Sequence, residues 1–536
     1  MKDHDTINSQ SQAVPESQKD KAVKTLQSFV NIVDAILGDL NEKETNGKKF
    51  SQEFQFDGIP LWWFYRRLIT SHVLPKQFNT PALVKKQKIN PLEKGYYQLL
   101  RLAFQRYIHY NERIKVRIVD KTKKQPEKYS KKKRVLFLTY TSHINKKSGE
   151  LYRINSILNL LKEEDQVEPF TLFADPISGH SYKEIKKMEN TIYHYVGKDE
   201  QEQANKISKE MYSKWTALPK EGLFGNKWEN LQPTLDFFFS REFMYHSILY
   251  YLATKRALQE QSVQCIVITA TTGFFERCMI AAAAKLDVPL VIIQHGEGLA
   301  TSDPELFPGM KVAIGVFGEK FADRLMKWGI DRKDIEIIGP IAFEEIYSFV
   351  QKEQKKTDKI LLITTSLIEG NRLSKEEYFQ NITSILRQLS VLQKEIVIKL
   401  HPAERNFDHY VKIIEKEGWK NMKVTQERGQ SVLYTLINDS DIVVNLYSTV
   451  ALQAMILGKP VVSMDIVLPT VPNADDGIWN GGIQVTKHDD LTKAAAEALL
   501  DPPHWKKNRQ ETVESYCYKV DGKENERLRD LIYKMS

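Results

Sequence analysis

Short apolar runs that alternate with helix-like stretches are the feature that most constrains this chain, and the pattern occurs twice. In the first series the runs lie at 134–143, 167–175, 264–272, 289–296 and 312–318. In the second series they lie at 359–366, 395–402, 422–426, 441–449 and 460–466. Apolar strands separated by helices form parallel sheets that helices cover on both faces. We therefore predict an α/β fold with two tandem Rossmann-like domains around a central cleft.

The segments outside these two series set the predicted boundaries. The polar residues 1–22 predict a disordered tail, and apolar residues at helical spacing predict a mostly helical N-terminal region with a basic linker over 23–133. The two Rossmann-like domains then cover 134–345 and 346–500. A helical tail, 501–536, completes the chain, and we expect it to pack back across the domain junction.

Composition narrows the class of protein. Hydrophobic residues make up 42% of the 536 residues and the formal net charge is +8, which is typical of a globular protein and permits an anionic ligand. The three cysteines lack metal-ligand spacing, and their odd, sparse count argues against a disulfide scaffold, so a reducing compartment fits. The polar start and the lack of a long apolar run predict a cytoplasmic location.

Several signatures of other enzyme classes are absent from the sequence. No GxxxxGK[ST] motif occurs, which excludes a P-loop NTPase, and no GxGxxG motif follows the first strand of either series. The motifs GxSxG, CxxC and HExxH are also missing.

Two segments of the second series predict a phosphate site. His401 and Pro402 follow the run at 395–400, and a histidine at a strand end can donate a hydrogen bond to a phosphate oxygen. Ser448 and Thr449 follow the run at 441–446 and precede a helix that we expect to start near Val450. Each segment alone is as readily a structural histidine or an ordinary helix cap, but together they favour a phosphate site.

A third segment, in the first series, predicts a general base. His295, Gly296, Glu297 and Gly298 follow the strand at 289–293. Glycines permit close backbone approach, and either His295 or Glu297 could deprotonate an acceptor hydroxyl. The alternative interpretation is a glycine-rich turn with a solvated glutamate.

Four further residues are weaker candidates. Arg372 follows the first strand of the second series and could neutralise a diphosphate. Glu276, Ser142 and His143 follow strands of the first series and could line the acceptor side. A glutamate at a helix start is favoured by the helix dipole in any protein, so Glu276 also has a purely structural interpretation.

Taken together, these residues resemble a known family. The strand-end HG at 295–296, the HP at 401–402, the S-T pair at 448–449 and the closing GKPVV at 458–462 resemble GT-B-fold glycosyltransferases. The resemblance is strongest to the bacterial capsule and cell-wall branch, which includes polysialyltransferases, Kdo transferases and CDP-glycerol glycerophosphotransferases. IIGP (337–340) is similar to its interdomain connector, and YKVDGKENERL (518–528) to its DGKAS-type ending, with Glu524 and Asn525 in place of small residues.

The resemblance implies a function and roles for residues. It implies a nucleotide-activated sugar or alditol donor held by His401, Ser448 and Thr449 in the C-terminal domain. It implies a glycan or lipid-linked acceptor at the N-terminal domain, with His295 or Glu297 as the base, and neither a cofactor nor a metal. The product would be a surface polysaccharide, and nucleic acid is not an expected partner.

Two alternatives to a transferase remain open from the sequence. A non-hydrolysing nucleotide-sugar 2-epimerase has the same two-domain fold, and a non-catalytic GT-B-like protein could bind glycan or act as a scaffold.

A separate expectation concerns the membrane. Trp62, Trp63, Phe64 and Tyr65 adjoin two arginines, and a lysine-rich stretch follows over 113–134, which suits peripheral contact with anionic lipid at the inner face of the membrane. The other interpretation places these aromatic residues in a core.

Overall fold

The computed structural model describes most of the two predicted domains and parts of the N-terminal region. The described residues are 44–45, 48–65, 110, 112–117, 132–140, 143–144, 151, 154–174, 190–220, 223, 232, 235–294, 305–350, 356–369, 373–446, 448–466, 478–486 and 489–536. Most of the helices that we predict before residue 110 lie outside these residues.

The first sheet contains six parallel strands. They are β5 (Lys133–Thr139), β6 (Val167–Phe173), β7 (Val263–Ile268), β8 (Leu290–Ile293), β9 (Val312–Val316) and β10 (Ile335–Ile337). Their order across the sheet is β10-β9-β8-β7-β5-β6, and every neighbouring pair is parallel. Five of the six coincide with the apolar runs of the first series, and β10 with the apolar segment that follows them.

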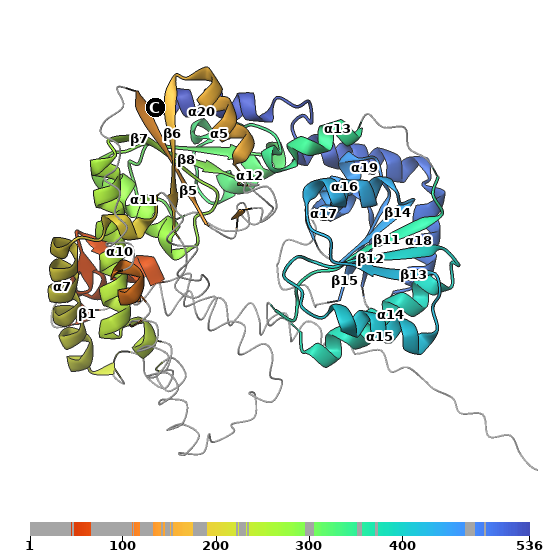
Figure 1. Cartoon of the computed structure of the whole chain (residues 1–536), viewed down its shortest axis with the longest axis horizontal. Helices are drawn as coiled ribbons and strands as arrows, with labels where there is room; N and C mark the ends of the chain where they lie inside the picture. The colour runs from red at the N-terminus through yellow and green to blue at the C-terminus, as the bar shows by residue number, and fades with distance from the viewer. Residues whose placement is uncertain are drawn as a thin grey trace, which may run out of the picture.

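Helices cover both faces of this sheet (Figure 1). On one face, α10 (Arg241–Glu260), α11 (Phe274–Leu286) and α12 (Glu319–Lys327) pack against alternate strand residues. On the other face, α5 (Asn155–Glu164) and the C-terminal α20 (Glu524–Met535) share an apolar cluster with the remaining strand residues. The last helix of the chain therefore belongs to the core of the first sheet.

The second sheet repeats the arrangement with a different strand order. Its strands are β11 (Lys359–Ile363), β12 (Glu395–Lys399), β13 (Met422–Thr425), β14 (Ile442–Asn445), β15 (Val461–Asp465) and β16 (Ile483–Thr486). They lie in the order β13-β12-β11-β14-β15-β16, again all parallel. This is the order of a dinucleotide-binding Rossmann sheet. The predicted architecture of two Rossmann-like domains is confirmed.

The helices of the second sheet also divide between its two faces. On one face lie α14 (Lys375–Ser390), α15 (Phe407–Glu417) and α18 (Leu491–Leu500). On the other face lie α16 (Gln430–Asn438) and α17 (Val450–Ile456). The apolar cluster under α16 and α17 is continuous with the cluster of the first sheet, so the two domains share one core.

The remaining described elements are short or lie at the rim. They are β1 (Glu44–Thr45), β2 (Lys48–Lys49), α2 (Phe50–Glu53), β3 (Gln55–Phe56), β4 (Ile59–Pro60), η3 (Ile192–Tyr195), α7 (Lys198–Ala217), η6 (Arg332–Asp334), η7 (Ile341–Ile346), α13 (Tyr347–Val350), η9 (Ile478–Gly481) and α19 (Pro503–Tyr516). β1 pairs with β2 and β3 with β4, both antiparallel. α10 packs along α7, and α19 packs on η9 and α17 of the second domain.

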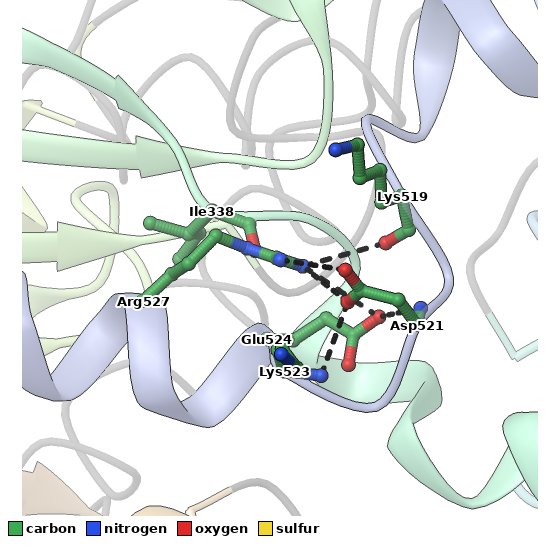
Figure 2. Close-up of polar contacts among 6 residues, drawn as sticks. All are labelled: Ile338, Lys519, Asp521, Lys523, Glu524 and Arg527. Carbon is green, nitrogen blue, oxygen red and sulfur yellow. Dashed lines mark hydrogen bonds and ion pairs between the residues drawn. The ribbon is translucent and has the colours of Figure 1, made fainter.

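The chain crosses between the domains twice, and a single arginine ties the two crossings together (Figure 2). After β10 the chain passes through Gly339 and η7 into the second domain, and after α19 it returns through 517–523 to α20. Arg527 Nε donates to the carbonyl of Ile338 at 2.8 Å, and its Nη1 donates to Asp521 at 3.2 Å. Gly339 has a φ of +86°, and a Cβ there would lie 3.0 Å from Arg527 Nη2.

Candidate functional site

The second sheet has a topological switch point between β11 and β14. The connections that leave these two neighbouring strands run to opposite sides of the sheet, as the strand order shows. Ligands of open α/β sheets bind outside the carboxyl ends of the strands at such a point. The loops that begin at Thr364, after β11, and at Leu446, after β14, therefore border the expected ligand position, and the loop after β12 lies beside them.

His401 lies in the loop after β12, with its imidazole half-buried. The backbone N–H of Ala403 donates to Nδ1 at 3.1 Å, so Nδ1 is the acceptor and Nε2 carries the proton in the neutral ring. Nε2 has no hydrogen-bond partner among the described residues. Burial lowers the pKa of His401, and the nearby Lys399 ammonium lowers it further against the opposing effect of Glu404. The ring can therefore donate one hydrogen bond while neutral.

A buried lysine that the sequence analysis did not select lies just before this histidine. Lys399 ends β12, and its side chain is 6% exposed. Its Nζ donates to the carbonyl of Leu400 at 2.9 Å, and within the described residues it forms no ion pair. Burial lowers its pKa, as does the guanidinium of Arg428, which itself donates to the Pro402 carbonyl at 2.9 Å. Glu404 and Glu427 oppose both effects on the pKa of Lys399, so cationic groups and carboxylates lie together at the end of β12.

Three polar residues, Lys399, Asn445 and Ser463, lie in one row across the sheet near this edge. Lys399 pairs in register with Ile363, Ile363 with Asn445, and Asn445 with Ser463. Residues in register on parallel strands share a face, here the face that α16 and α17 cover. With strands about 4.8 Å apart, Lys399 and Asn445 are separated by about 10 Å.

Some polar groups near this row have no partner in the described part of the chain. The hydroxyl of Ser463, which is fully buried, accepts and donates no hydrogen bond there. The side-chain oxygen of Gln453, on α17, is equally without a partner among the described residues. Both groups are buried where α17 packs against β14 and β15.

Ser448 and Thr449 lie where the sequence predicts them, in the loop between β14 and a helix that begins at Val450. The buried Asn445 fixes this loop, because its Nδ2 donates to the Ser448 carbonyl at 3.0 Å and its Oδ1 accepts from the Ser448 N–H at 3.3 Å. Ser448 Oγ accepts from the N–H of Val450 at 3.4 Å, a local bond that spans two residues and precedes the helix. The Thr449 hydroxyl forms no cap, and the helix is seven residues long.

Two of the weaker candidates, His143 and Glu276, lie in the described part of the first domain. His143 is 8% exposed, and its Nδ1 lies 3.3 Å from the Thr139 hydroxyl at the end of β5. Glu276 is 5% exposed in the first turn of α11, where its carboxylate lies over Gly273. Ser142, His295, Glu297 and Arg372 lie outside the described residues, so their roles stay predictions.

The aromatic segment at 62–65 lies in the core and is not available to a membrane. Trp62, Phe64 and Tyr65 are at most 1% exposed. Trp63 is half-buried against the ring of Phe307, at 4.6 Å, and beneath the guanidinium of Arg277, at 4.7 Å. The aromatic half of the membrane expectation is therefore wrong, because α10 and α11 bury these side chains. Of the lysine-rich stretch, residues 118–131 lie outside the described residues. Lys115 and Arg134, which are described, are buried and form ion pairs with Glu112 and Glu168.

The described residues offer neither a metal site nor a membrane span. They contain no group of three or more His, Cys, Asp or Glu side chains arranged to hold a metal ion. None of the helices in that part of the chain has the length and apolar character needed to cross a membrane.

Comparisons with known proteins give likenesses of structure only. No protein-family model and no curated protein matches the chain. A Staphylococcus aureus MnaA–UDP complex is 13% identical, with a TM-score of 0.46 over 75% of this chain and 96% of the other. The UDP-GlcNAc 2-epimerase of Neisseria meningitidis bound to UDP-GlcNAc is 12% identical, with a TM-score of 0.46 over 75% and 100%. A Rickettsia africae glycosyltransferase is 10% identical, with a TM-score of 0.41 over 76% and 100%.

Proposed function

We propose that the carboxyl edge of the second sheet binds the phosphate groups of a nucleotide-activated donor. The observation that carries the proposal is the pair of basic side chains, Lys399 and His401, at the end of β12 beside the switch point. Lys399 is buried there without an ion pair in the described residues, beside the imidazole of His401. A buried charge is costly unless it is paired, and a bound phosphate would add a direct partner to the longer-range effect of Glu404 and Glu427 on Lys399.

The proposed reaction is transfer of the activated group to an acceptor hydroxyl. The acceptor oxygen attacks the activated carbon or phosphorus, the bond to the donor phosphate breaks, and the acceptor proton passes to His295 or Glu297. His401, Lys399 and the hydroxyl of Thr449 would hold the charge that develops on the departing phosphate, and Arg372 would add to it. The roles of His295, Glu297 and Arg372 in this reaction rest on the sequence alone. We propose a surface polysaccharide or lipid-linked glycan as the acceptor, with neither metal nor cofactor.

A 2-epimerase is the second candidate, and it uses the same phosphate site. It is the activity named for similar solved structures from Neisseria meningitidis and Methanocaldococcus jannaschii. The two candidates differ in their need for an acceptor. An epimerase converts the donor alone, whereas a transferase turns over rapidly only when an acceptor hydroxyl is supplied. A non-catalytic glycan-binding protein would do neither.

The test begins with binding. Purified protein is screened by thermal shift against UDP, GDP, CMP, CDP and their sugar or glycerol conjugates, beside His401→Ala and the surface control His504→Ala. A ligand that binds the folded state raises the melting temperature by mass action. We expect a shift with one nucleotide class that His401→Ala abolishes and His504→Ala keeps. No shift with any nucleotide would refute the donor site.

Turnover then separates the candidates. The nucleotide-sugar that binds is incubated alone and with a glycan or lipid-linked acceptor, and the products are resolved by mass spectrometry and NMR. Epimerised sugar without an acceptor would establish the second candidate and refute the transferase. A nucleotide that binds but is never turned over would favour the non-catalytic protein.

A further inference from the structure

A buried glutamate, Glu404, lies three residues after His401 and accepts hydrogen bonds on both carboxylate oxygens. It is 5% exposed. Oε1 accepts from the hydroxyls of Tyr378 and Tyr410, each at 2.9 Å. Oε2 accepts from the backbone N–H of His401 at 2.9 Å and from the hydroxyl of Thr364. Four donors from four parts of the domain thus meet at one carboxylate.

The two tyrosines anchor this carboxylate to rigid elements. Tyr378 lies on α14 and Tyr410 on α15, both fully buried, and their hydroxyl oxygens are 2.8 Å apart. Burial raises the pKa of each tyrosine well above its ordinary value, so both remain protonated donors at every physiological pH. The carboxylate therefore cannot move without leaving a buried donor unpaired, which is costly.

The same carboxylate sets the conformation of the loop that presents His401. The N–H of His401 donates to Glu404 and also lies 3.1 Å from the Thr364 hydroxyl, while the Glu404 N–H donates to the His401 carbonyl at 3.0 Å. The loop so closed brings the Ala403 N–H to the imidazole Nδ1. That bond is what leaves Nε2 as the protonated nitrogen and directs it away from the loop.

We infer that Glu404 is a positioning residue of the proposed donor site, which holds the His401 imidazole in the tautomer and orientation that donate Nε2–H to phosphate. The inference rests on the proposed function for the identity of the ligand, but not for the geometry. Glu404 acts through His401. Its own oxygens are fully used by protein donors, so it does not contact the ligand.

The experiment has a readout that does not depend on a ligand. Full-length protein with ¹⁵N-labelled histidine side chains is examined by NMR, and the His401 signals are identified by their loss in His401→Ala. Glu404→Gln keeps the shape of the side chain, but its NH₂ cannot accept from the donors that meet there. Tyr410→Phe removes one of the four donors and keeps the ring, and it decides the question should the glutamine variant fail to fold. Glu415→Gln, at an exposed glutamate of α15, is the matched control.

The expected result has two parts. In Glu404→Gln the His401 Nδ1 signal moves away from that of an unprotonated acceptor, and the affinity for UDP or inorganic pyrophosphate falls by about ten-fold, whereas Glu415→Gln leaves both unchanged. A wild-type tautomer and affinity in folded Glu404→Gln would overturn the inference. If wild-type protein binds neither probe, the donor site itself fails, while the tautomer measurement still decides whether Glu404 positions the ring.

Discussion

At the scale of single residues, Lys399 combines a cost to stability with a proposed role in binding. Its ammonium is buried without an ion pair in the described residues, so Lys399→Met should raise the free energy of unfolding by about 1 kcal/mol, as replacements of buried charges often do. The same change should weaken binding of a nucleoside diphosphate about ten-fold, because a charge-assisted contact is lost. Urea unfolding and calorimetric titration measure the two effects. The exposed Lys420→Met should change neither, and a loss of both stability and affinity would contradict this account.

His401 should titrate below its ordinary pKa of 6.5, because burial and Lys399 both disfavour the imidazolium. A lowered folded-state pKa means that the unfolded chain takes up the proton first as the pH falls. The contribution of His401 to stability is therefore complete above about pH 6.5 and is lost as the pH drops toward the folded-state pKa. Comparing the pH dependence of unfolding in wild type and His401→Asn measures this contribution. A steeper loss of stability at acid pH in the variant would show that the sign is wrong.

Sequence reasoning found the residues that differ most from their surroundings and missed those that look ordinary. A histidine and proline after an apolar strand stand out, as do a serine and threonine before a helix. Lys399 resembles a surface lysine, although it shares the face of Val397 in a buried strand, and that period of two was the available signal. Glu404 gave no signal, because Tyr378 and Tyr410 reach it only through the tertiary fold.

At the scale of elements, the connector between the domains depends on Gly339. Its φ is +86°, and an added Cβ would also meet the Lys519 carbonyl and Glu524 at 3.1 Å. Gly329 has a φ of +85° with open space around it, so it is a matched control. Gly329→Ala should cost about 1–2 kcal/mol for the left-handed backbone alone. Gly339→Ala should cost more, because it also displaces the contacts of Arg527. Equal losses in the free energy of unfolding, measured with urea, would mean that the contacts of Arg527 add nothing to stability.

Most strands that the sequence predicts are buried on both faces, as in β8, β11, β12 and β14, because such strands read as apolar runs. β16 was missed although β13, also a four-residue edge strand with a single buried side chain, was predicted. Local sequence does not separate the two, because each alternates apolar and polar residues over only four positions. The role of Arg527 could not be predicted either. Its partners Ile338 and Asp521 come from both crossings, and nothing local links them.

At the scale of the whole molecule, the first domain is completed by the last helix of the chain. Leu528, Leu531 and Ile532 are buried in one cluster with α5 and with alternate residues of the first sheet. The helix lies beside these elements, far from the second sheet that precedes it in sequence (Figure 1). A helical tail that packs back was expected from the sequence, but which face it covers depends on contacts between residues hundreds of positions apart.

Shortening a buried side chain of α20 should therefore destabilise parts of the first domain that are distant in sequence. Leu528 is fully buried, and Leu528→Ala should destabilise the protein by about 2–5 kcal/mol, as other buried leucine truncations do. Hydrogen exchange read by mass spectrometry should show faster exchange in α5 and β8, which contact α20, and little change in β12 and β13 of the second sheet. Leu500→Ala, at a leucine that is 82% exposed, should leave every region unchanged. Faster exchange confined to 524–536 would show instead that the helix frays alone and that the first sheet does not depend on it.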